Sequence, residues 1–458
     1  MTFERDFSSF ELLRHAAPRM LMSLVVMSYL VVDGLLVSRY LGTTALASIS
    51  LSYPIISFLM AFGVMTASGS GTCAARSLGS GKPNEARTLL ATALCTNGSL
   101  GLLLGGISFA FLPVIFERIG MPAEARDLAA TYMRILLAAA PLFLLSFVVQ
   151  TFLTVCARPK DALLVAVVSG VVNAAADWFA LSILGTGIEG AACATVLSWL
   201  TAVLFGLVLL ARPQCAASLR FVRPSLGKLP AIFRTGGFEF TSNLCGVFTL
   251  WFFNRAFLAE LGVDGVAALS VATFTVFVFN AAYHGYCEAV APIVAYKSGA
   301  NDRRGVLQTL RRALFAALCL SLSAYMCSSV AGSAVFGYFA AENTTVIALL
   351  KIAYPIQALS LLFLGLNLFL TYALAALAFG GCASAVSLLR TFILPCAAIA
   401  VLPAAAEAIE SSGLAQLVEL SASPLWFAVP FAELVTLFAA GALLFAKAKL
   451  PQPTGFGA

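Results

Sequence analysis

The sequence is short of charged residues. Asp, Glu, Lys and Arg together make up 10% of its 458 residues, against about 25% in soluble domains. Apolar residues account for 61%, and the mean hydropathy is +0.97. These values exclude a soluble globular class and indicate a polytopic membrane protein. The net charge is +6, and the basic residues lie in the connections between the apolar runs. Membrane orientation explains their position, so the charge does not indicate nucleic-acid binding.

The residues that serve metal and phosphate chemistry are also scarce or scattered. There are two histidines, His15 and His284, and the 11 cysteines occur singly with no CxxC pair. Free cysteine usually behaves as a small buried hydrophobe. No Gly-rich loop followed by Lys-Ser/Thr is present, which argues against an ATP-driven pump. We therefore expect no cofactor, and the polar start of the chain predicts no cleaved signal peptide.

Long apolar runs dominate what is present. A spanning helix needs about 20 largely apolar residues, and the chain holds a dozen such runs joined by short polar connections. We expect an all-α polytopic membrane protein with twelve spans at 16–38, 45–75, 87–116, 126–154, 160–184, 188–211, 231–259, 265–297, 306–338, 344–378, 380–405 and 424–446. Several runs exceed the bilayer thickness, and prolines such as Pro141 predict bends inside them.

The basic residues predict an orientation. A cytoplasmic N-terminus places most of the 27 lysines and arginines on the cytoplasmic side, which is the usual bias. We therefore expect a multi-pass protein of the cell (inner) membrane with both termini cytoplasmic. The longest polar connection lies near the middle, which predicts an N-terminal lobe, a cytoplasmic loop and a C-terminal lobe at 1–211, 212–228 and 229–458.

The two halves are similar to each other. A shift of 220 positions superposes Leu41-Gly42 on Leu261-Gly262 and Gly79 on Gly299, so two turn-forming loops recur at equal spacing. Six spans in each half is an even number, which inserts both halves the same way up. We expect two six-helix lobes related by a pseudo-two-fold axis along the membrane normal, with a substrate cavity between them.

Polar residues inside the first-half runs form one predicted site. Asn173 and Asp177 are four residues apart, which stacks their side chains on one helix face. Asp33 lies in the first run and Thr195 in the sixth. An ionised Asp near the bilayer centre costs about 2.5–3.5 kcal/mol, so it must be paired, hydrated or ligated. Oxygen ligands of this kind suit Na+, and the acids could instead bind protons. The alternative is that each residue bonds a neighbouring helix.

Polar residues of the second half allow two interpretations each. Glu239 lies about one turn inside the seventh run, where it could bind a cation or substrate, or could extend to Arg234 at the membrane edge. His284 and Glu288 are four residues apart, so they could relay protons or form interhelical hydrogen bonds.

These features resemble the multidrug and toxic compound extrusion (MATE) family over nearly the whole chain. The stretch from Val32-Asp33-Gly34 to Ala45-Leu46-Ala47 is similar to the family's Asp-containing helix and its turn. Further similar motifs are Gly79–Arg87, Gly299–Arg304, Arg158-Pro159-Lys160 and Gly187–Thr195. The second half looks closest to a bacterial multidrug efflux branch through Phe238–Asn243, Asn254, and Arg390 and Glu433, which we expect to pair.

The resemblance implies a twelve-helix exporter of bulky, often cationic, organic compounds in exchange for Na+ or H+. It carries the cation-binding role onto Asp33, Asn173, Asp177 and Thr195. Residues expected near this site or the cleft are Tyr29, Gly34, Trp178, Glu239, Asn243, His284 and Glu288. Many members have Leu before and Pro after the fifth-helix Asp, where this chain has Ala176 and Trp178, which affects the expected substrate preference. A bend around Asp33 and Gly34 is the expected coupling movement.

Two other functions compete with the exporter. A lipid-linked precursor flippase of related fold would need basic residues in its central cavity, whereas the buried charges of the first half are acidic. A membrane-embedded enzyme would need several acids and histidines at one place, and only His284 and Glu288 are available. We therefore expect no enzyme but a transporter, a monomer in the lipid bilayer, whose partners are a small organic molecule and a coupling cation.

Overall fold

The chain folds into helices and short connections over the residues that this computed structural model describes, which are 3–119, 123–213, 215–219, 222–339, 344–411 and 423–448. The first half contains α1 (Ser9–Leu41), α2 (Thr43–Gly79), α3 (Pro83–Ala110), α4 (Leu112–Ile119), α5 (Ala123–Ala138), α6 (Ala140–Val155), α7 (Pro159–Trp178), η1 (Phe179–Leu184) and α8 (Gly187–Leu210). The second contains η2 (Leu226–Lys228), α9 (Leu229–Gly299), α10 (Arg303–Phe339), α11 (Thr344–Ala358), α12 (Ser360–Ala376), α13 (Gly380–Leu388), η3 (Leu389–Ile393), α14 (Leu394–Ser411), η5 (Pro424–Phe427) and α15 (Ala428–Ala448).

These helices make twelve membrane spans, which confirms the prediction. In the described ranges, ten helices are long and apolar enough to cross a membrane, and the pair α5 and α6, bent by 54°, adds an eleventh. α9 consists of two arms, because its backbone is non-helical at Gly262, near the middle of the helix. Counting the arms separately brings the number of spans to twelve. The predicted spans at 231–259 and 265–297 correspond to these arms. The bend between α5 and α6 precedes Pro141, where one of the bends was predicted.

Local sequence explains where several helices begin. The Ser8 hydroxyl accepts a hydrogen bond from the Glu11 backbone N–H at 3.2 Å, and the Glu11 carboxylate accepts one from the Ser8 N–H at 2.7 Å. This capping box satisfies N–H groups that the first turn of α1 leaves free. Pro83 and Pro159 occupy the first turns of α3 and α7, where the missing N–H costs nothing.

The predicted repeat is visible in the backbone. Gly42 and Gly262, which the shift of 220 positions superposes, both have positive φ, at 86° and 67°. Each makes the turn between two long antiparallel helices, a conformation that a side chain would strain. Ala157 and Ala378 also share positive φ after α6 and α12. The two halves therefore repeat their turns as well as their apolar runs.

The halves touch most closely where α2 crosses α9. A Cβ on Gly79 would lie 1.9 Å from the Tyr296 carbonyl oxygen, and one on Gly299 would lie 2.0 Å from that of Arg76. Residues 76 and 296 are themselves related by the shift of 220 positions, so these two contacts are equivalents under the pseudo-two-fold. Small residues allow membrane helices to approach this closely. The pseudo-two-fold axis thus passes between the ends of α2 and α9.

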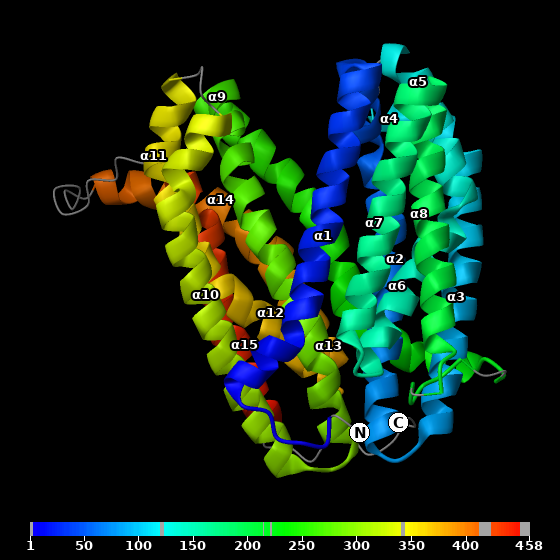
Figure 1. Ribbon diagram of the computed structural model, residues 1–458. Coiled ribbons are helices and arrows are strands. Elements are labelled where there is room, and N and C mark those ends of the chain that lie inside the picture. Colours follow the sequence, from blue (N-terminus) through cyan, green and yellow to red (C-terminus); the bar gives the residue numbers. More distant parts are fainter. Residues whose placement is uncertain are drawn as a thin grey trace.

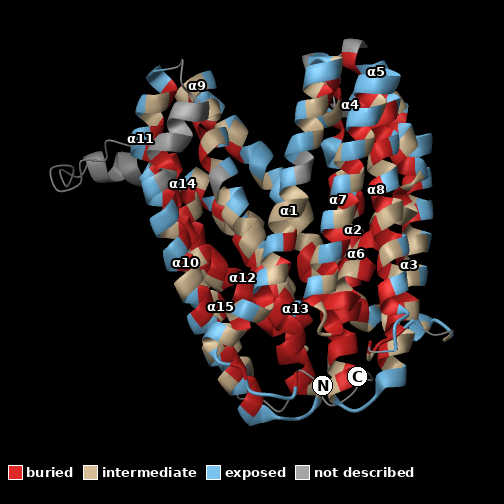
Figure 2. Ribbon diagram, in the orientation of Figure 1, coloured by how far each residue is buried: buried red, intermediate tan, exposed pale blue. Residues whose placement is uncertain are grey.

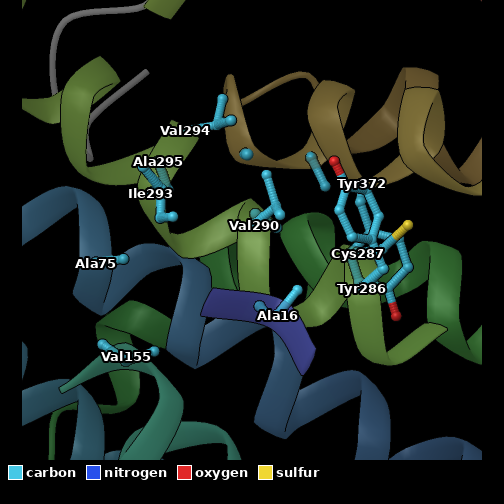
Figure 3. Packing of buried hydrophobic residues seen from close by; sticks show 14 of the residues in the cluster. Ala16, Ala75, Val155, Tyr286, Cys287, Val290, Ile293, Val294, Ala295 and Tyr372 are labelled. Atoms are coloured by element: carbon cyan, nitrogen blue, oxygen red, sulfur yellow. The ribbon is translucent and has the colours of Figure 1, made fainter. Parts of the chain in front are cut away.

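Burial shows that the halves share a core at one end only. One hydrophobic cluster combines both halves, including Ala75, Val155, Tyr286 and Val290 (Figure 3). A second cluster draws only on residues 37–199, and a third only on 253–428. Buried residues accordingly concentrate at the end where the ribbons converge (Figure 2). The two groups of helices are joined at this end and packed separately toward the other.

Figure 1 shows the resulting arrangement of two helix groups with α1 between them. The first turn of α1 and the last turn of α15 lie at the same end of the molecule, the end where the groups converge. This placement agrees with an even number of spans. The predicted lobe boundaries at residues 211 and 229 flank a connection that is only partly described, and they stay predictions.

Gly79→Ala should destabilise the folded protein by about 1–3 kcal/mol, because the added methyl group overlaps a backbone carbonyl that cannot rotate away. The matched control is Gly98→Ala in α3, where a Cβ meets no atom within 4 Å. Thermal unfolding of both variants in detergent measures the difference. An unchanged midpoint for Gly79→Ala would show that the α2–α9 crossing is looser than described.

Candidate functional site

Asp33 of α1 and Asp177 of α7 lie next to each other inside the first lobe. Asp177 is fully buried and Asp33 is half-buried, and among the described residues no third residue donates a hydrogen bond to Asp33 Oδ1 or to either Asp177 carboxylate oxygen. In the described part of the chain neither carboxylate forms an ion pair. Two adjacent carboxylates in a low-dielectric environment repel each other unless a proton or a cation compensates them. The pair therefore requires a positive charge that the described residues do not supply.

Neutral oxygen groups surround this pair. Asn173 is buried one helical turn before Asp177. The Thr195 hydroxyl of α8 donates to the Ala191 carbonyl at 3.1 Å, and the Tyr132 hydroxyl of α5 lies beside Thr195 and near both carboxylates. The structure thus adds to Asp33, Asn173, Asp177 and Thr195 a residue that sequence reasoning missed. Tyr132 carried no signal, since an aromatic residue in an apolar run is usually packing.

The remaining residues predicted around this pair have different outcomes. The side chain of Tyr29 lies outside the described residues. Gly34 has room for a Cβ, which would meet Leu46 Cδ1 at an ordinary 3.6 Å. Trp178 is 51% exposed and follows Asp177 on a different face of α7. The first-lobe site therefore consists of buried and half-buried oxygen groups, with Trp178 outside it.

Glu239 is buried in the second lobe rather than extended to the membrane edge. Its carboxylate accepts a hydrogen bond from the Tyr372 hydroxyl of α12, whereas Arg234 is exposed. The interpretation in which Glu239 reaches Arg234 is therefore wrong, because the α9–α12 packing encloses the carboxyl group. His284 Nδ1 lies 3.3 Å from the same Tyr372 hydroxyl. The Asn243 amide donates to the Glu239 backbone carbonyl at 2.9 Å and does not contact the carboxylate.

Glu288 pairs with Arg19 of α1 and not with His284. Arg19 Nε and Nη2 both lie 2.7 Å from Glu288 Oε2, and Arg19 Nη1 lies 3.5 Å from the Gln150 backbone carbonyl. Arg19 is buried, so it is not one of the basic residues exposed at the membrane surface. Together with Tyr372, the pair borders a cavity of about 30 Å³, room for one or two water molecules. His284 and Glu288 thus form interhelical bonds, as one of the two interpretations predicted.

Arg390 and Glu433 pair as predicted. Arg390 Nη1 lies 3.2 Å from Glu433 Oε1, and both side chains are more than nine-tenths buried. The Asn367 amide donates to Glu433 Oε2 at 2.6 Å and to the Glu433 backbone carbonyl at 2.7 Å. This second-lobe pair is compensated by the protein itself, unlike the two carboxylates of the first lobe.

Comparison with known families places these sites in context. A family model described as MatE matches residues 18–179 and 243–396, one stretch in each half. The chain belongs to the MATE family. It is thus a multi-pass membrane protein of a transporter family, and the two matched stretches contain Asp33, Asp177, Glu288 and Arg390.

Relatives and solved structures agree with this assignment. The chain is 24% identical over 304 residues to the multidrug export protein MepA of Staphylococcus aureus, covering 66% of this chain and 67% of that one. It is 24% identical over 399 residues to MepA of Staphylococcus saprophyticus, covering 86% and 87%. An outward-facing structure of a multidrug resistance MATE family transporter superposes with a TM-score of 0.86 at 20% identity, covering 97% and 98%. A transporter from Pyrococcus furiosus gives 0.85 at 19%, with the same coverage.

Glu433→Gln should destabilise the protein by about 3–5 kcal/mol, because it leaves the buried Arg390 charge uncompensated. Replacing both partners, as Arg390→Met with Glu433→Leu, should restore much of this loss. The exposed Glu189→Gln is the matched control and should change stability by less than about 0.5 kcal/mol. Unfolding free energies measured in mixed micelles test all three. A double variant as unstable as Glu433→Gln would contradict the ion-pair explanation.

Proposed function

We propose that this MATE protein exports organic, mainly cationic, compounds by alternating access in exchange for Na+ or H+. It acts as a monomer in the bacterial inner membrane with both termini in the cytoplasm. The observation that carries the proposal is the adjacent pair of half-buried Asp33 and buried Asp177, which has no cationic partner among the described residues. The names of the staphylococcal relatives, multidrug export proteins, support the class of cargo.

The coupling cation binds at the first-lobe pair. Asp33 and Asp177 supply the negative charge, and Asn173, Thr195 and Tyr132 supply neutral oxygens around it. Hard oxygen ligands suit Na+, and a single proton shared between the carboxyl groups would satisfy the same charge requirement. A cation that binds one conformation better than the other shifts the equilibrium between them by no more than its difference in affinity. Loading of the cation and release of cargo are then alternative states of one protein.

The conformation of the protein follows from the position of the core that the two halves share. The halves are joined at the end that carries the termini, so a cytoplasmic position of the termini makes this state closed toward the cytoplasm. α1 couples the site to that closed end, since it carries Asp33 in the first lobe and Arg19 against Glu288 of the second half. Bending of α1 between these residues is the movement through which the cation acts.

Asp33→Asn and Asp177→Asn should each reduce gradient-driven transport at least tenfold, because each removes one of the two charges that hold the cation. In proteoliposomes, accumulation of a fluorescent organic cation under an imposed Na+ gradient, and separately under a pH gradient, identifies the ion. The exposed Asp127→Asn in α5 is the matched control and should transport normally. Equal gradient-driven transport by the parent and both site variants would remove the first-lobe site, whereas no movement under either gradient in any of them would favour lipid-linked flipping.

The same two substitutions should not lower thermal stability, in contrast to their effect on transport. Without a coupling cation at neutral pH, each Asn variant should be at least as thermostable as the parent, because it removes the repulsion between two adjacent carboxylates. If Na+ is the coupling ion, adding it should raise the unfolding midpoint of the parent and leave that of the Asn variants unchanged.

Tyr132→Phe should weaken cation binding about 2- to 12-fold, the range expected for one hydrogen-bonding group worth 0.5–1.5 kcal/mol. The ring stays in place, so the packing of α5 is kept and only the hydroxyl beside Thr195 is lost. Tyr53→Phe, at an exposed position of α2, controls for loss of a hydroxyl elsewhere. The measurement is the cation concentration that gives half-maximal stabilisation. An unchanged value would remove Tyr132 from the site.

A further inference from the structure

A second polar cavity lies at the end of the molecule where α1 begins, away from the carboxylate pair. Its volume is about 310 Å³. It is bordered by the first turns of α1, through Arg14, His15 and Pro18, and by residues 157–161, which include the first turn of α7. None of the groups assigned to the coupling site or to the Arg19–Glu288 pair borders it. Its chemistry is therefore independent of the proposed transport function.

Positive charge exceeds negative charge around this cavity. Arg14, Arg158 and Lys160 border it, and Asp161 is the single carboxylate among the residues around it. Asp161 forms an ion pair with Arg158, whose Nε lies 2.5 Å from its Oδ2, although this oxygen accepts no hydrogen bond of good geometry among the described residues. The cavity thus carries an excess of two positive charges, which favours an anionic ligand.

Two buried nitrogen atoms beside the cavity lack partners in the described part of the chain. Arg158 Nη1 has no acceptor even though Nε is paired, and His15 Nε2 has none either. The His15 ring is held in place by Phe3 and Phe7, whose ring centroids lie 5.9 and 5.8 Å away. A buried donor without an acceptor is costly. An oxyanion in the cavity would supply the acceptor that the Arg158 guanidinium lacks.

The surface next to the cavity is apolar on both helices. Leu164, Val167 and Val171 continue the face of α7 that begins with Lys160, and all three are exposed. On α1, the exposed Leu21 follows two turns after Arg14 on one face. Each helix therefore presents a cation at its end, followed by an exposed apolar stripe on α7 and by the exposed Leu21 on α1. A soluble anion would use only the first of these features.

We propose that this cavity binds the phosphate group of an anionic phospholipid, whose acyl chains lie along the exposed apolar stripe of α7 and against Leu21 of α1. The phosphate contacts Arg14, Lys160 and the unpaired Nη1 of Arg158. Since the cavity joins the start of α1 to the start of α7, the bound lipid stabilises this end of the first lobe. Each Lys or Arg near an anionic leaflet contributes about 1 kcal/mol of attraction, so two such residues account for roughly a thirtyfold change in affinity.

The test uses the full-length protein in a nonionic detergent, with thermal unfolding as the readout. Dioleoylphosphatidylglycerol, dioleoylphosphatidylcholine and inorganic phosphate are titrated separately. We expect phosphatidylglycerol alone to raise the midpoint at low lipid-to-protein ratio. The variant Arg14→Gln with Lys160→Gln should increase the half-saturating concentration at least tenfold. Its matched control, Lys82→Gln with Arg212→Gln, removes two exposed charges from the same end outside the cavity and should leave that concentration unchanged.

Three results would overturn the proposal. Equal stabilisation by phosphatidylcholine, or an equal loss in the cavity and control variants, would show that no anion-specific site exists. Equal stabilisation by inorganic phosphate would assign the cavity to a soluble anion and not to a lipid. If the double variant fails to fold, the single exposed change Lys160→Gln is measured, with an expected increase of about fivefold in the half-saturating concentration. Because no transport is measured, failure here leaves the proposed function untouched.

Discussion

A charge buried inside a membrane protein has to be compensated, and the arrangement of this chain follows from where compensation is provided. Arg390 and Glu433 neutralise each other in the second half, and Arg19 and Glu288 do so between α1 and α9. Asp33 and Asp177 differ from these pairs, since the described residues bring two carboxylates together and no cation to them. Insertion of a carboxylate is costly, so a fold that pairs two of them requires an external proton or cation. This requirement is the physical basis of the cation coupling proposed for the first lobe.

The packing of the halves determines what such a response can move. Where α2 crosses α9, glycines place backbone against backbone, and the shared hydrophobic cluster fills the same end. Toward the opposite end each half has its own core. Opening the joined end would expose the hydrophobic contacts that the two halves share there, whereas the two separate cores would stay intact. The structure therefore predicts movement of the lobes as rigid groups, with the cost concentrated at one crossing.

Sequence patterns predicted the large features because these depend on periodic or local signals. The lengths of the apolar runs predicted the twelve spans. Gly42 and Gly262 indicated the repeat, because each makes a turn with positive φ, which favours glycine. The four-residue spacing of Asn173 and Asp177 predicted a shared helix face. Tyr132 and the partner of Glu288 were not predictable, because both depend on which helices pack together and neither leaves a local pattern. Glu239 shows the same limit, since its partner Tyr372 is far along the chain.

The helix α1 is where charge compensation and lobe packing meet. Arg19 and Asp33 are separated by about 21 Å of helix, from a rise of 1.5 Å per residue. Their side chains contact different halves of the molecule. Arg19 is held by Glu288 of α9, and Asp33 faces Asp177 of α7. A helix fixed at both points cannot follow either group of helices without bending. Pro18, directly before Arg19, removes one backbone hydrogen bond from α1 and lowers the cost of bending at that end. The proposed cation site and the contact with the second half thus lie on one continuous helix that is anchored to both halves.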